Sequence, residues 1–179
     1  ESLLAMTDST LVHIAVGDGR VIGEHDLPLL DRIKWTSVDA HAEGFVLGGR
    51  DLERREYALA KWQPGGALTL KSVPLSHVFR SSQIEAALAD EDTCGADIFD
   101  VAALRVAPDG HLVVALGGDG ERLGACQGAC AIAHADAASL ELLQVQVVDE
   151  CDGATGVLVA ADGGVVVNCC DSLHVLAPR

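Results

Sequence analysis

The chain has 179 residues, 49% of them hydrophobic and 22% charged, which is typical of a globular domain rather than a disordered segment. Its formal net charge is −15, and a field of that sign repels phosphate backbones, so we expect no nucleic-acid partner and favour a basic ligand, a cationic peptide or a divalent metal. No apolar run reaches the ~18 residues that would span a bilayer, so we expect no membrane insertion.

The first unit, residues 1–30, contains three strand-like runs, "SLLAMTD", "TLVHIAV" and "RVIGEHDL". The second unit, residues 31–76, begins with the hairpin "SVDAHAEGFVLGG" and continues with "REYALAKW" and "ALTLKSVPL". An insert follows at residues 77–100, and its stretch "SSQIEAALADED" predicts a short helix because Ser82 and Glu85 have the spacing of a capping box.

The third unit, residues 101–148, contains "VAPDGHLVV", and the fourth, residues 153–179, contains "VAADGGVVV" 53 positions later with six of nine residues matched. An Asp-Gly pair between apolar runs indicates a hairpin, because the tight turn needs a positive φ that glycine adopts readily. Two more strand-like runs follow the hairpin in the third unit, and one, "SLHVLAPR", follows it in the fourth. The repeated unit is therefore a hairpin plus further antiparallel strands.

A repeat of four antiparallel strands over about 45 residues resembles the blade of a β-propeller. The resemblance covers nearly the whole chain but is to the broad class only, because no motif of a particular propeller family is present. It implies an all-β fold of about three and a half to four blades, with one short helix in the insert. The alternative is a β-sandwich with similar hairpins.

The strand count raises a question about the two ends. The first unit lacks a first strand and the last unit lacks a fourth, and exposed strand edges normally have to be covered. We expect the chain to be a processed piece or segment of a longer propeller, or to be completed by a second chain.

All six cysteines lie in the second half of the chain, which favours disulfides and a secreted, periplasmic or cell-surface location. We expect at least two disulfides, pairing Cys94 with Cys126 or Cys130, and Cys151 with Cys169 or Cys170. A soft-metal site built from these thiols is the alternative.

In propellers the loops between second and third strands and the connections between blades share one face, which usually carries the site. Here that face would hold residues 50–55, 77–100, 117–128 and 149–152. The acidic group in the insert makes Asp90, Asp92 and Asp97 candidate calcium ligands, although their spacing does not match an EF-hand loop. We expect no other cofactor.

The residue patterns contain no Ser/His/Asp or Cys/His set, no nucleophile motif and no phosphate loop. The first functional hypothesis is therefore a non-catalytic module that presents an acidic, loop-rich face to a protein or peptide. The alternatives are a propeller hydrolase or lyase with acidic residues at its central channel, and a structural subunit of a larger assembly.

Overall fold

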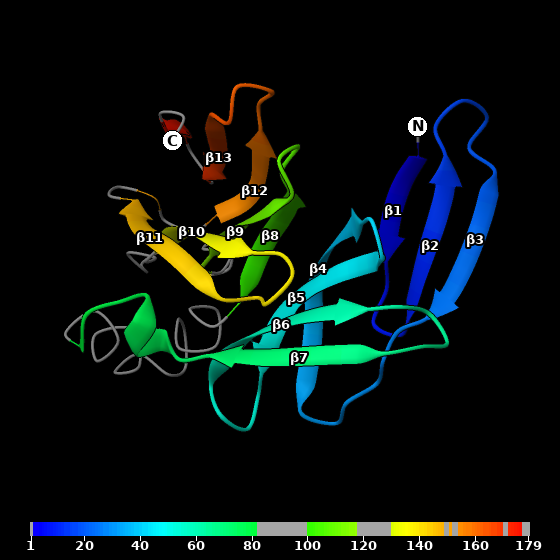
Figure 1. The fold of residues 1–179 in the computed structure, drawn as a ribbon, viewed down its shortest axis with the longest axis horizontal. Helices are drawn as coiled ribbons and strands as arrows, with labels where there is room; N and C mark the ends of the chain where they lie inside the picture. The colour runs from blue at the N-terminus through cyan, green and yellow to red at the C-terminus, as the bar shows by residue number, and fades with distance from the viewer. Residues whose placement is uncertain are drawn as a thin grey trace.

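The computed structural model describes residues 2–81, 100–117, 130–148, 151, 154–169 and 172–176 (Figure 1). These residues form four antiparallel sheets with three, four, four and three strands in chain order, and within each sheet every strand pairs with its neighbours in the sequence. This is the meander of a propeller blade, repeated. The predicted fold class, all-β with four-stranded blades, is confirmed.

The first two sheets contain β1 (Ser2–Met6), β2 (Thr10–Ala15) and β3 (Val21–Asp26), then β4 (Ile33–His41), β5 (Gly44–Asp51), β6 (Glu56–Trp62) and β7 (Leu68–Val73). The last two contain β8 (Val101–Val106), β9 (His111–Leu116), β10 (Cys130–Asp136) and β11 (Leu142–Val148), then β12 (Ala154–Val159), β13 (Val165–Cys169) and β14 (Leu173–Leu176). A short 3₁₀ turn, Leu75–His77, follows β7. The helix expected in the insert falls mainly on residues 82–92, outside the described residues. In the described part of the chain, no helix has the length and apolar character to cross a membrane.

The sheets follow one another around an arc, with the first sheet at the right of Figure 1 and β12 and β13 at its top. β8 packs on β4 and β5, and β12 packs on β8 and β9, so each first strand contacts the first and second strands of the sheet before it. β4, by contrast, contacts the first sheet chiefly through β1. The first sheet thus meets the second mainly through β1.

Close approach of the second and third sheets depends on Gly48 in β5. A Cβ at this position would lie 2.4 Å from Cγ1 of Val101 and 2.8 Å from Cδ2 of Leu104. Hydrogen bonds between first strands join the same two sheets: the Thr36 hydroxyl donates to the Val101 carbonyl (2.8 Å), and the Asp39 carboxylate accepts from the Val106 amide (2.8 Å). The blades are thus joined by apolar packing and by polar contacts.

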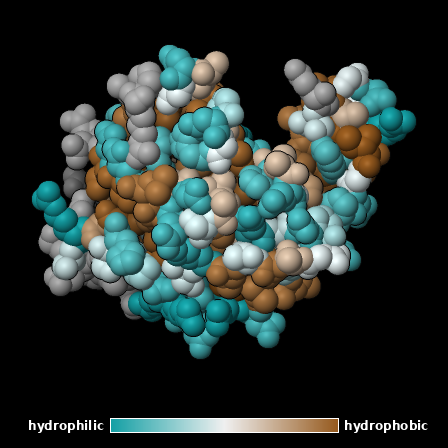
Figure 2. Space-filling view, in the orientation of Figure 1, coloured by the Kyte–Doolittle hydropathy of each residue, from teal (hydrophilic) through white to brown (hydrophobic). Residues whose placement is uncertain are grey.

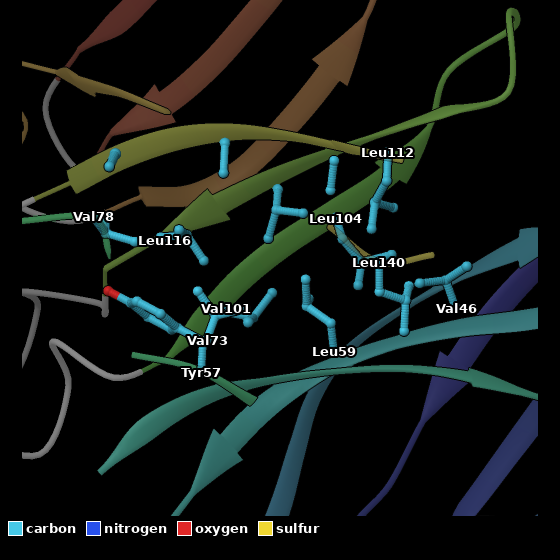
Figure 3. Packing of buried hydrophobic residues seen from close by; sticks show 14 of the residues in the cluster. Val46, Tyr57, Leu59, Val73, Val78, Val101, Leu104, Leu112, Leu116 and Leu140 are labelled. Carbon is cyan, nitrogen blue, oxygen red and sulfur yellow. The ribbon is translucent and has the colours of Figure 1, made fainter. Parts of the chain in front are cut away.

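The main hydrophobic core lies between the second and third sheets, where Tyr57 and Leu59 of β6 face Leu104, Leu112 and other side chains of β8 and β9 (Figure 3). Two smaller clusters lie between the first and second sheets and between the third and fourth. β9 and β10 are buried on both faces, which explains their nearly unbroken apolar runs. In β3 and β14 exposed and partly buried residues alternate, so each end sheet has one covered face and one uncovered face.

Candidate functional site

A pocket of about 380 Å³ lies between the third and fourth sheets, at the two Asp-Gly turns that repeat in the sequence. The turn between β8 and β9 forms one wall and the turn between β12 and β13 forms the other. The lining residues are Ala107, Pro108, Asp109, His111, His134, Ala161, Asp162 and Gly163. Repetition of the hairpin in adjacent blades is what brings two carboxylates to one pocket.

The two turns have the same geometry. Gly110 and Gly163 have φ values of 88° and 84°, the left-handed region in which glycine is favoured. In each turn the glycine amide donates to the carbonyl three residues earlier, at 2.9 Å in the first turn and 3.0 Å in the second. The aspartate of each turn also accepts from the amide two residues on, which turns both carboxylates toward the same end of the sheets. The predicted hairpins are confirmed.

A hydrogen-bonded chain of three side chains occupies the wall formed by the third sheet. The carboxylate of Asp109 contacts Nδ1 of His111, and Nε2 of His111 lies 3.2 Å from Nδ1 of His134. Because a carboxylate accepts, Nδ1 of His111 donates to Asp109, and either of the two facing ring nitrogens can donate in the contact between His111 and His134. His134 is 9% exposed, so the chain links a solvent-exposed carboxylate to a buried imidazole.

The charge of the pocket is set by its aspartates. The amide of His111, followed by its imidazole, lowers the pKa of Asp109 below the ordinary 3.8, so this carboxylate is ionised at neutral pH. Asp162 lines the opposite wall. A pocket with a carboxylate on each side suits a cationic group, in keeping with the net charge of −15.

Three of the six predicted disulfide cysteines lie together between the third and fourth sheets. Cys151 and Cys169 form a disulfide with an S–S distance of 2.10 Å, one of the two pairings expected for Cys151. Cys130, offered by the sequence as a partner of Cys94, is instead a buried free thiol, so that expectation is corrected. Cys130, the first residue of β10, belongs to the buried apolar cluster, and the two other described sulfurs in that cluster are paired with each other.

The uncovered faces of the two end sheets carry apolar side chains. On the last sheet Leu158 pairs with Val166 and Val166 with Val175, so these three side chains form a row across the strands. Leu158 is 65% exposed and Val175 is 77% exposed. We call this the C-end face.

The first sheet repeats the arrangement. Leu3 pairs with Ile14 and Ile14 with Val21, which forms a row across β1, β2 and β3 that we call the N-end face. Leu3 and Val21 are both more than half exposed. Figure 2 shows this sheet projecting as a lobe at the upper right, with a notch between it and the rest of the molecule.

Most of the loop face predicted to hold the site lies outside the described residues. This applies to the calcium candidates Asp90, Asp92 and Asp97, and to Cys94, Cys126 and Cys170. Those assignments stay predictions. Among the contacts described on this face, Nη1 of Arg50, near the end of β5, lies 3.3 Å from Oδ2 of Asp100, at the end of the insert.

The sequence interpretation missed the pocket at the hairpin turns because it considered only the opposite end of the blades. The signal was nevertheless present, since two copies of one hairpin in adjacent blades must place their turns side by side. The link between His111 and His134 had no local signal, because it depends on the register that pairs β9 with β10.

No family model and no curated protein sequence matches this chain. In fold it is similar to hydrazine synthase from Kuenenia stuttgartiensis, with a TM-score of 0.42, 13% identity, and coverage of 93% of this chain and 52% of that chain. The β-propeller domain of Cps50 (Swd1) from Myceliophteria thermophila has a TM-score of 0.44 and 15% identity, over 97% of this chain and 61% of that one. A protein of unknown function from Bacteroides caccae has a TM-score of 0.36 and 9% identity, over 93% of this chain and 66% of that one. This chain thus spans between about half and two thirds of the lengths of these structures.

Proposed function

We propose that the chain is a non-catalytic interaction module whose N-end and C-end faces bind further β-sheets of a protein partner. The observation that carries this proposal is the distribution of exposed large hydrophobic side chains. Within the described residues, most of them belong to the two end sheets and their turns: Leu3, Val16, Val21, Ile22, Leu158, Leu173 and Val175. Uncovered apolar faces of this kind mark interaction surfaces.

Further sheets fit these faces because each face continues a packing that already occurs inside the molecule. The third sheet covers one face of the second, and the fourth sheet covers one face of the third. The C-end face is in the position that would receive the next sheet, and the N-end face is in the position that would receive the preceding one. β1 and β14 are also edge strands, each with one unpaired side within the described sheets.

The partner and its compartment follow from charge and redox chemistry. With a net charge of −15, the rim around each apolar face favours a partner with basic residues at the matching positions. The buried Cys151–Cys169 disulfide supports a secreted, periplasmic or cell-surface location, where such bonds form and persist.

The experiment measures the mass of the purified chain by light scattering over a range of concentrations. We expect a mass that rises above 18.6 kDa with concentration, because the uncovered faces associate when no partner is present. Leu158→Asp and Val175→Asp should suppress that rise. Leu143→Asp is the matched control, since Leu143 is 60% exposed but lies on β11, the outer strand of a complete sheet.

A stable monomer with cooperative unfolding, unchanged by either C-end variant, would contradict the proposal. If Leu143→Asp suppresses the concentration-dependent rise in mass as much as the C-end variants do, the proposal is also contradicted, because added negative charge alone would then be the cause.

A hydrolase is the second candidate, and the chain from Asp109 through His111 to His134 favours it. An imidazole oriented by a carboxylate is the usual arrangement of a general base. Two features rank it second: the Asp109 side chain is 70% exposed, and none of the described lining residues is a serine, cysteine, threonine or lysine. If the chain hydrolyses an activated ester faster than buffer alone does, and His134→Ala slows that hydrolysis, the hydrolase would become the first candidate.

A further inference from the structure

Three cysteine sulfurs converge between the third and fourth sheets, contributed by separate segments of the chain. Cys130 begins β10, Cys151 precedes β12 and Cys169 ends β13. Their Sγ atoms all lie within 4.8 Å of one another, and all three side chains are buried. Two of the sulfurs are joined as a disulfide, and the third is a free thiol beside it. Neither the interaction surfaces nor the pocket uses this group.

The spacing suits a metal ion once the disulfide is opened. Zinc–sulfur bonds of about 2.3 Å in a tetrahedral site place neighbouring sulfurs about 3.8 Å apart. The present Sγ separations, all within 4.8 Å, are of that order. Reduction of the Cys151–Cys169 disulfide would leave three thiols around one position.

The surroundings select the kind of ion. The sulfurs lie in a cluster of buried apolar side chains that includes Ile132, Val157 and Val167. Soft thiolate ligands in such a shell favour a d¹⁰ cation over Ca²⁺ or Mg²⁺, which need oxygen ligands.

We propose that the reduced protein binds one Zn²⁺ ion through Cys130, Cys151 and Cys169, and that the Cys151–Cys169 disulfide is the oxidised, metal-free form of the same site. A dithiol reductant supplies two electrons and two protons to the disulfide and becomes a cyclic disulfide itself. Zn²⁺ then displaces the three thiol protons, which leaves a complex with one net negative charge.

The test uses the full chain with Cys94→Ser, Cys126→Ser and Cys170→Ser, so that only the three cysteines of the cluster remain. After anaerobic reduction by a dithiol and removal of the reductant, the protein is titrated with Cd²⁺, whose thiolate charge-transfer absorption reports binding. We expect one equivalent per chain, displacement by Zn²⁺, and no signal from the oxidised protein.

Cys130→Ala in the same background keeps the disulfide pair and removes the third ligand. We expect its affinity for Cd²⁺ to fall by at least about ten-fold, with the circular dichroism of the oxidised form unchanged. Unchanged affinity would overturn the proposal, as would a reduced protein that is folded but binds no Cd²⁺. Cys130 would then be a small apolar core residue beside a structural disulfide. If reduction unfolds the chain, refolding on addition of Zn²⁺ supports the site, and failure to refold overturns it.

Discussion

Replacement of Gly48 by alanine tests the packing of the second sheet on the third. The new Cβ would lie 2.4 Å from Cγ1 of Val101, more than 1 Å inside the usual carbon–carbon contact of about 3.5 Å. Val101 and Leu104 are fully buried, so neither side chain can move out to solvent. Overpacking of this kind costs about 1–3 kcal/mol, offset by about 0.4–1 kcal/mol from the lower entropy of the unfolded chain. We expect a net loss of about 1–2 kcal/mol in the free energy of unfolding.

A second substitution gives this prediction a specific signature. Val101→Ala alone removes two buried methyl groups and should cost about 2–3 kcal/mol. In the double variant, the alanine at position 48 fills part of the space that the valine leaves. The double variant should therefore lose at least about 1 kcal/mol less unfolding free energy than the sum of the losses of the two single variants.

The assay is equilibrium unfolding in urea, followed by the fluorescence of Trp35 and Trp62, which are both buried. Gly156→Ala is the matched control, because a Cβ in that strand would lie 3.8 Å from its nearest neighbour, an ordinary contact. We expect the control to be neutral or slightly stabilising. Additive effects at positions 48 and 101, or a neutral Gly48→Ala, would refute the packing described here.

Three further predictions concern polar contacts. Asp51→Ala should lower the free energy of unfolding by about 1–3 kcal/mol, measured in urea, because the buried carboxylate pairs with Nε of Arg32 at 3.1 Å and accepts from two backbone amides. Trp35→Phe should cost about 0.5–1.5 kcal/mol in the same assay, since the indole donates a 2.9 Å hydrogen bond to a backbone carbonyl. Hydrogen bonds from Ser139 lower the pKa of Asp136 below 3.8, so its contribution to stability is full above pH 3.8 and is lost as the pH falls through the folded-state pKa. The urea midpoints of wild type and Asp136→Ala should therefore converge as the pH is lowered to 3, and a constant difference would contradict this origin.

The fold was predictable because its signals are local. The alternation of apolar residues marked the strands, and the Asp-Gly pairs at positions 109–110 and 162–163 marked two hairpins.

The sites were less predictable because they depend on how sheets pack. Nothing near Cys130 in the sequence indicates that its sulfur lies beside a disulfide formed by residues of the next sheet. The expected pairing with Cys94 considered loops alone, whereas β10 places this thiol within the apolar cluster. The contact between His111 and His134 likewise requires the strand register. Sequence spacing carries no information of this kind.

Hydrogen exchange in the two end sheets is the most direct measurement of whether further sheets cover the N-end and C-end faces. Amide protection in β1 and β14 would be followed by mass spectrometry at low and high protein concentration, with β7 and β11, the outer strands of complete sheets, as internal references. If the end faces bind further sheets, exchange in β1 and β14 slows as the concentration rises, while exchange in β7 and β11 does not change. If exchange in β1 and β14 does not depend on concentration and is already as slow as in β7 and β11, the end faces do not bind further sheets and the proposal is contradicted.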